Sequence, residues 1–467
     1  MSTEPTSEPD EGLRVPWSRS RGAVPRRLLQ PLQSFLEAET SSAVLLLSAA
    51  VLAIAWANSP WSVAYEDLWR TVVTLRIGEW VLREDLRHVV NDGLMSLFFL
   101  VVGLEIKREL LTGELRDRRA AALPVVAALG GMVVPALIYL ALNASGDGAE
   151  GWGIPMATDI AFALGVLTLA ARSAPASLKP FLLTLAIVDD IGAILVIALF
   201  YSGGVAMGPL LLASALLVAI VVLQRLDVRS AVVYVSLGVG VWLAFHGAGV
   251  HPTIAGVILG LLTPAVPFQR PRAVSAEAVR TAATTVDDPQ PPDADSPQWL
   301  RLAMLSREAV SPLARAEAAL HPWTSYAVIP LFAFANAGVQ LSAEALGDAV
   351  TSPVTLGVVL GLVAGKVLGV TLASAFAVRT GLGRLPTGCG WRHMVGLSAV
   401  AGIGFTVSLF IAELAFGDPT VAAEAKVGIF AASLIAGILG FAVLRSGRVA
   451  SPVEPSPPGD VSAGRER

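Results

Sequence analysis

The chain has 467 residues, of which 54% are hydrophobic and only 15% charged, and its mean hydropathy is +0.66. Soluble domains carry about 25% charged residues, so this composition excludes an ordinary soluble protein and favours one that crosses a membrane repeatedly. The net charge of −4 argues against a nucleic-acid partner, and the single cysteine, Cys389, excludes an internal disulfide.

Apolar stretches of about spanning length occur roughly twelve times along the chain. They group into two blocks, residues 41–264 and 321–447, which we expect to hold eight and four spans. The stretches lie near 41–57, 93–106, 120–142, 154–171, 180–201, 207–224, 230–246, 249–264, 323–340, 353–377, 393–415 and 424–445. We expect the N-terminal tail 1–40, the linker 265–320 and the tail 448–467 to be largely disordered, since they are polar and rich in proline.

Basic residues gather at alternating ends of these stretches. Lys107, Arg108, Arg225 and Arg379 belong to the base-rich set of ends, which predicts a cytoplasmic location for that side and for both termini. The first loop on the opposite side contains residues 71–82, which are rich in β-branched side chains. This pattern predicts a short external β-hairpin, with a surface helix as the alternative.

The most informative segment is FLLTLAIVDDIGAILVIALF, residues 181–200, whose only charges are Asp189 and Asp190. An ionised carboxylate at the centre of a membrane helix costs at least ~2.5–3.5 kcal/mol, and two adjacent ones resist being ionised together. A pair in this position indicates binding of a cation, of protons, or of both.

Two other stretches carry signs of a broken helix. Asp159 lies inside the fourth stretch beside Thr158, and Pro155 precedes them, while Gly402 and Gly404 interrupt the eleventh. Proline and glycine weaken helical hydrogen bonding at membrane depth. Breaks at matching places predict an inverted repeat, with spans three to five and ten to twelve as its halves and a central binding site.

One lysine, Lys366, is embedded in an apolar run and should have a carboxylate partner. Adjacent helical positions point about 100° apart, so one of Asp189 and Asp190 can pair with it while the other faces the ion path. Lys366 then serves either as a structural partner or as a proton carrier. Asp159 either caps a helix end, offsetting its dipole, or contacts the ion.

At this point the sequence resembles the NhaA family of bacterial Na+/H+ antiporters. The stretches that carry the resemblance run from the second to the eleventh span: NDGLMSLFFLVVGLEIKREL (91–110), GGMVVPALIYLA (130–141), GWGIPMATDIAFALGVL (151–167), LAIVDDIGAI (185–194), GVHPTIAGVILG (249–260), LHPWTSYAVIPLFAFANAGV (320–339), GKVLG (365–369) and GIGFTVSLFIAELAF (402–416). The pair ATDIAFALG and VDDIGAI is highly specific. The resemblance implies an all-α polytopic membrane protein with about 12 transmembrane helices, inverted repeats and two broken helices.

The family also implies roles for individual residues. Asp190 is implied to be a principal Na+ ligand, Asp189 to pair with Lys366, and Asp159, next to Thr158, to lie where the broken helices cross. A cluster linked to pH regulation is implied for Glu105, Arg108, Glu109, Glu317 and His321. A pH-regulatory role is also implied for His251, and a further functional position inside the membrane for Asp92. The alternatives are a simple salt-bridge cluster at a helix end and solvated histidines at span ends.

We therefore predict a secondary active antiporter, not an enzyme, that exports Na+ or Li+ in exchange for protons by alternating access without a cofactor. The resemblance further implies pH regulation, an electrogenic cycle, a bacterial inner-membrane location and a homodimer formed through residues 71–82. An intramembrane aspartyl protease, using Asp159 with Asp190, and a cation channel are the alternative functions.

Overall fold

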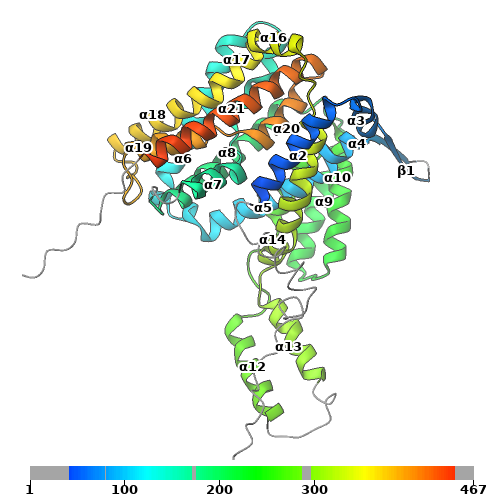
Figure 1. Ribbon diagram of the computed structural model, residues 1–467. Helices are drawn as coiled ribbons and strands as arrows, with labels where there is room; N and C mark the ends of the chain where they lie inside the picture. The colour runs from blue at the N-terminus through cyan, green and yellow to red at the C-terminus, as the bar shows by residue number, and fades with distance from the viewer. Residues whose placement is uncertain (1–40, 79, 171–174, 287–295, 447–467) are drawn as a thin grey trace, which may run out of the picture.

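The computed structural model describes residues 41–78, 80–170, 175–286 and 296–446, which are helical apart from one two-stranded antiparallel sheet (Figure 1). The predicted disordered tails, 1–40 and 448–467, lie outside the described residues. The α-helices are α2 (Ser41–Ala57), α3 (Ser62–Trp69), α4 (Leu86–His88), α5 (Met95–Thr112), α6 (Arg118–Asn143), α7 (Ile160–Leu169), α8 (Leu178–Phe200), α9 (Met207–Arg225), α10 (Ala231–Ala248), α11 (Thr253–Leu262), α12 (Pro271–Val286), α13 (Ser296–Glu308), α14 (Pro312–Trp323), α15 (Ile329–Asn336), α16 (Ala343–Thr351), α17 (Pro353–Leu360), α18 (Lys366–Arg379), α19 (Trp391–Val400), α20 (Phe405–Ala415) and α21 (Pro419–Arg445).

Shorter elements complete the chain. The strands are β1 (Val72–Ile77) and β2 (Trp80–Asp85), the 3-10 helices are η4 (Glu114–Arg116) and η5 (Asp147–Met156), and the π-helical turns are η3 (Val89–Leu94), η6 (Thr324–Val328) and η7 (Gly361–Gly365).

Seven helices of the described chain are long and apolar enough to cross a membrane, or ten if each of three bent helix pairs is one span. This is fewer than the expected twelve or so. The stretch 249–264 contributes only the ten-residue helix α11. The stretch 323–340 continues α14 through the π-turn η6 into α15, which ends at Asn336. The all-helical architecture of many spans with broken helices is the expected one.

Both predicted helix breaks are confirmed. The chain bends by 44° between η5 and α7 and by 47° between α19 and α20. Pro155 lies in the last turn of η5, where it lacks a backbone donor. At the second break, a side chain on Gly402 would collide with the backbone carbonyl oxygen of Leu362, so the close approach of that segment requires glycine. A third bend, of 117° between α2 and α3, was not predicted.

A close helix crossing joins α6 to α18, which belong to the two halves of the predicted repeat. Gly130 and Gly369 face each other there, and a side chain on either would meet the backbone oxygen of the other. The contact brings the start of α18 against the middle of α6. Lys366, one turn before Gly369, is consequently fully buried.

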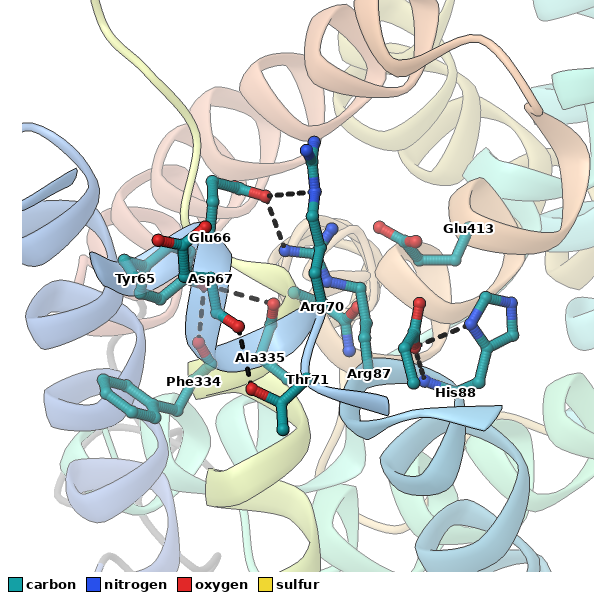
Figure 2. A network of polar contacts seen from close by, with 12 residues as sticks. Tyr65, Glu66, Asp67, Arg70, Thr71, Arg87, His88, Phe334, Ala335 and Glu413 are labelled. Atoms are coloured by element: carbon teal, nitrogen blue, oxygen red, sulfur yellow. Dashed lines mark hydrogen bonds and ion pairs between the residues drawn. The ribbon is translucent and has the colours of Figure 1, made fainter. Parts of the chain in front are cut away.

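The predicted hairpin is also confirmed, and the surface-helix alternative for this segment is wrong. β1 pairs with β2 from Val72↔Asp85 to Ile77↔Trp80, and Gly78 in the turn has φ of +63°. Figure 2 shows how its base is attached: the Tyr65 hydroxyl lies 2.8 Å from the carbonyl oxygen of Phe334 and 3.1 Å from that of Ala335 in α15, within reach to donate to either. Beside it, Glu66 lies 3.5 Å from Arg87, which follows β2.

The expectation of a largely disordered linker across 265–320 is wrong for its described residues, which form α12, α13 and the start of α14. α12 and α13 project from the bundle (Figure 1). Their sequences are rich in Ala, Leu, Arg and Glu, which favour helix, and Pro271 begins α12. Gln269 and Arg229 donate hydrogen bonds to Glu308 at the end of α13, and these bonds hold the pKa of that carboxyl below its usual value. Residues 287–295 lie outside the described chain.

Candidate functional site

A buried ion pair joins α8 to α18. The Lys366 Nζ lies 2.6 Å from Oδ2 of Asp189, and both side chains are fully buried. The Thr158 hydroxyl lies 2.8 Å from the same carboxylate oxygen and accepts a hydrogen bond from Lys366 Nζ at 3.0 Å. Asp189, rather than Asp190, is therefore the partner of Lys366, as the family resemblance implied.

Asp190 is the neighbouring carboxylate, and it is only 6% exposed. Its Oδ1 has no hydrogen-bond partner within the described part of the chain, and neither does Oδ1 of Asp189. One lysine balances one of the two negative charges. A second positive charge is needed whenever Asp190 is ionised, because an uncompensated buried charge is costly.

Asp159 lies where the two broken helices cross. Its Oδ1 accepts the N–H of Phe162 (3.1 Å) and so caps α7, while its Oδ2 accepts the N–H (3.1 Å) and the hydroxyl (2.7 Å) of Thr406 at the start of α20. Its own N–H donates to the carbonyl of Ile403 at 2.6 Å. One carboxylate thus caps two helix N-termini, whose dipoles favour a negative charge. The capping role predicted for Asp159 matches these contacts.

Thr158 connects this crossing to the ion pair. Besides Asp189, its hydroxyl lies 2.8 Å from the carbonyl oxygen of Ala401, just after α19. A hydroxyl has one hydrogen, so Thr158 donates to only one of these oxygens at a time. Lys366 is linked through Thr158 to the C-terminal end of α19, where a positive charge is favourable.

Asp159, Asp189 and Asp190 do not form a three-carboxylate cluster. Within the described residues, no group of three or more Asp, Glu, His or Cys side chains is arranged to hold a metal ion. The Asp159 carboxylate is already occupied by Phe162 and Thr406. This arrangement also disfavours the protease alternative, which requires Asp159 and Asp190 to share a proton.

A cavity of about 360 Å³ opens on the base-rich side of the bundle, between the end of α5, η4 and the starts of α6 and α8. Its inner residue on α8 is Thr184, five positions before Asp189, or about 7.5 Å along a helix. Acidic side chains predominate among its polar lining residues, which are Glu109, Thr112, Glu114, Asp117 and Thr184.

The proposed pH cluster is only partly assembled. Arg108 forms an ion pair with Glu317 between α5 and α14. Glu109 instead accepts the N–H of Glu114 at 2.7 Å, and Glu105 is half-buried one turn earlier. His321 is exposed, and its side chain makes no hydrogen bond or ion pair to any described residue.

Asp92 and His251 come together elsewhere. Asp92 Oδ1 lies 3.6 Å from Nε2 of His251, near the hairpin rather than the cavity. Sequence reasoning did not pair these two residues, and it missed Thr406 altogether. Thr406 follows the glycine break of GIGFT by two positions, which is where a helix N-terminus presents free N–H groups, so that spacing was a usable signal.

Comparisons with known proteins show the family of the chain. The family described as Na+/H+ antiporter 1 matches residues 33–444. The chain is 47% identical to the Na(+)/H(+) antiporter NhaA 2 of Sorangium cellulosum over 424 residues, which cover 90% of each protein. It is also 47% identical to the Na(+)/H(+) antiporter NhaA of an Anaeromyxobacter species, and that match covers 92% of this chain and 94% of the relative. Among solved structures, the sodium proton antiporter MjNhaP1 of Methanocaldococcus jannaschii matches with a TM-score of 0.44 and 14% identity, over 87% of this chain and 91% of that one. The family match spans most of the chain at high identity, and the chain therefore belongs to the NhaA family of Na+/H+ antiporters, multi-pass transporters of bacterial membranes.

Proposed function

We propose that Na+ and protons compete for the carboxylate of Asp190, and that this competition drives the antiport. The observation that carries the proposal is a single one: Asp190 is buried, and its Oδ1 has no hydrogen-bond partner in the described chain, whereas Asp189 beside it is neutralised by Lys366. Na+ is a hard cation that prefers oxygen ligands, and a carboxylate supplies both the oxygen and the balancing charge.

The cycle follows from charge balance. With Na+ bound, Asp190 is ionised and its charge is compensated. When protons occupy the site, Asp190 is neutral and Na+ is released, and a conformational change exposes the site to the other side. Li+ is a hard cation of the same charge and would follow the same path. Lys366 either keeps its ion pair with Asp189 throughout or gives up a proton during the cycle.

Asp159, Thr158 and the two breaks form the frame of this site. Asp159 holds the N-termini of α7 and α20 together, and Thr158 joins the Lys366–Asp189 pair to the end of α19. Because α7 and α20 both begin at the crossing, a small rotation of either half-helix changes which oxygen atoms face the ion. This role for Asp159 requires no direct contact with Na+.

Access is proposed from the cytoplasm. The cavity beside Thr184 lies between the end of α5, η4 and the start of α8, which carry Arg108, Arg116 and Lys179 respectively. The positive-inside rule assigns such ends, and with them both termini, to the cytoplasmic side. If more than one proton moves per Na+, the membrane potential contributes about 2.3 kcal/mol per net charge at 100 mV to Na+ export.

A homodimer through the hairpin is also proposed. Val72, Val73 and Val81 are exposed on β1 and β2, and an unpaired strand edge favours pairing with a second copy. The molecular mass of the detergent-solubilised protein, with and without residues 72–85, tests this: an unchanged dimer without the hairpin excludes it.

The competition is tested by Na+ binding to the purified protein, measured by calorimetry between pH 6 and pH 9. We expect the apparent affinity to fall as the pH is lowered, by up to about tenfold per pH unit for each proton displaced, because each unit raises the proton concentration tenfold. A dissociation constant for Na+ that stays the same across this range would contradict competition at a shared carboxylate.

The Arg108–Glu317 pair supplies a prediction about regulation. We expect Glu317→Gln to shift the pH profile of transport without abolishing its maximum, because the change removes the carboxylate paired with Arg108 and leaves Asp190 intact. His321→Gln is the matched control, since His321 is exposed and unpaired within the described residues, and we expect most of its activity and its profile to persist. Activity against pH in vesicles decides the point. A Glu317→Gln profile superimposable on that of the unmodified protein would reduce the cluster to a solvated salt bridge.

A further inference from the structure

The π-helical turn η3 follows α4 near the start of the span 86–112, and Asp92 lies within it. A π-turn inserts an extra residue into a helix, so a carbonyl there needs donors from outside the regular pattern. The carbonyl oxygen of Asp92 accepts the hydroxyl of Ser96 and the indole N–H of Trp242, which lies 3.0 Å away on α10. The same indole nitrogen is 2.9 Å from the Ser96 oxygen.

This turn aims the Asp92 carboxylate at His251. The His251 ring is held on its other side, where Nδ1 lies 2.6 Å from the Thr253 hydroxyl. Its edge meets the ring of Phe410 in α20 at 5.3 Å between centroids. If the extra residue were lost, Asp92 would rotate by about 100° and leave His251.

α10 carries a second contact on the same face. The ring of His246 stacks on Trp242, with centroids 5.8 Å apart and planes 9° apart. His246 Nε2 lies 3.4 Å from Oε1 of Glu84 in β2. Through His246 and Glu84, α10 is thereby attached to the external hairpin. At the base of the hairpin, His88 (Figure 2) pairs with Asp85.

We infer that Trp242 is a positioning residue for the Asp92–His251 pair, and that His246 and Glu84 extend this control to the external hairpin. The inference rests on the proposed antiport and on the pH-regulatory role that the family resemblance implies for His251. Phe410 links the His251 ring to the ion site, because Phe410 belongs to α20. The first turn of α20 binds Asp159 through Thr406. The titratable groups that face this network are Glu84, Asp85, His88, Asp92, His246 and His251.

The test compares two tryptophan variants. Trp242→Phe keeps an aromatic ring but removes the donor to Asp92. Trp56→Phe is the matched control, because it also removes one indole N–H bond, the 3.1 Å bond to the Trp61 carbonyl, away from Asp92. We expect Trp242→Phe to shift the pH of half-maximal antiport by about 0.5–1 unit, the size expected for one lost hydrogen bond. The shift should be toward lower pH, since His251 loses the carboxylate that favours its protonated form.

Na+ affinity at the pH of maximal activity should stay the same in both variants, and Trp56→Phe should keep the original profile. Coincident profiles for Trp242→Phe and Trp56→Phe overturn the inference. If Trp242→Phe folds poorly, Ser96→Ala removes the other donor to the Asp92 carbonyl. Hydrogen exchange of residues 89–96 then reports the stability of the π-turn directly. Unchanged exchange together with an unchanged pH profile would also overturn the inference. Loss of Na+ binding in Asp190→Asn tests the proposed ion site separately, with the Trp242 network intact.

Discussion

We expect Asp190→Asn to abolish Na+-driven proton movement, while the protein still inserts and folds. The substitution removes the negative charge that binds Na+ and the group that accepts the proton, so both halves of the exchange fail together. Folding should survive because a neutral amide is cheaper to bury than a carboxylate, and because Oδ1 of Asp190 has no hydrogen-bond partner to lose within the described residues. Proton flux in proteoliposomes under an imposed Na+ gradient measures the effect.

The control for this experiment is Asp348→Asn, the same chemical change at an exposed aspartate of α16. It should leave the flux unaltered. Na+ binding measured by calorimetry supplies the second readout, and we expect the heat of binding to vanish only in Asp190→Asn. Robust antiport by a well-folded Asp190→Asn would place the ion elsewhere.

Features that depend on local chemistry could be predicted from the sequence. Two charges in an apolar run identified Asp189 and Asp190, and Pro155, Gly402 and Gly404 located both breaks. The β-branched residues of 71–82 and Gly78 predicted the hairpin. Each of these signals lies within a few residues of the feature it predicts.

Features that depend on long-range packing were harder to predict. Residue spacing established that only one of Asp189 and Asp190 could face Lys366, and the family resemblance, rather than any periodicity, indicated which; the choice depends on how α8 is rotated against α18. The bond from Thr406 to Asp159 joins residues 247 positions apart and follows from the crossing of two half-helices. The linker was misread for another reason: its polarity and prolines favoured disorder, while the helix-forming residues of α12 and α13 outweighed them.

The ion pair leads to the second large effect. Asp189→Asn leaves the Lys366 ammonium buried without its carboxylate, and Lys366→Gln leaves the Asp189 carboxylate without its ammonium. Removing one partner of a buried pair costs about 3–5 kcal/mol, so each single variant should be markedly less stable. The double variant, Asp189→Asn with Lys366→Gln, should recover much of the loss, because two neutral amides replace two charges. The melting temperature of the purified protein follows all four forms.

A double-mutant cycle then separates two roles for Lys366. Stability losses that simply add would mean that the two side chains do not interact, against the 2.6 Å contact. If stability returns and antiport persists with a changed number of protons per Na+, Lys366 is chiefly a structural partner of Asp189. If stability returns but transport is lost, the pair itself carries a proton. The proton count, measured from the membrane potential at which flux reverses, distinguishes these outcomes because a lost proton changes the charge moved per cycle.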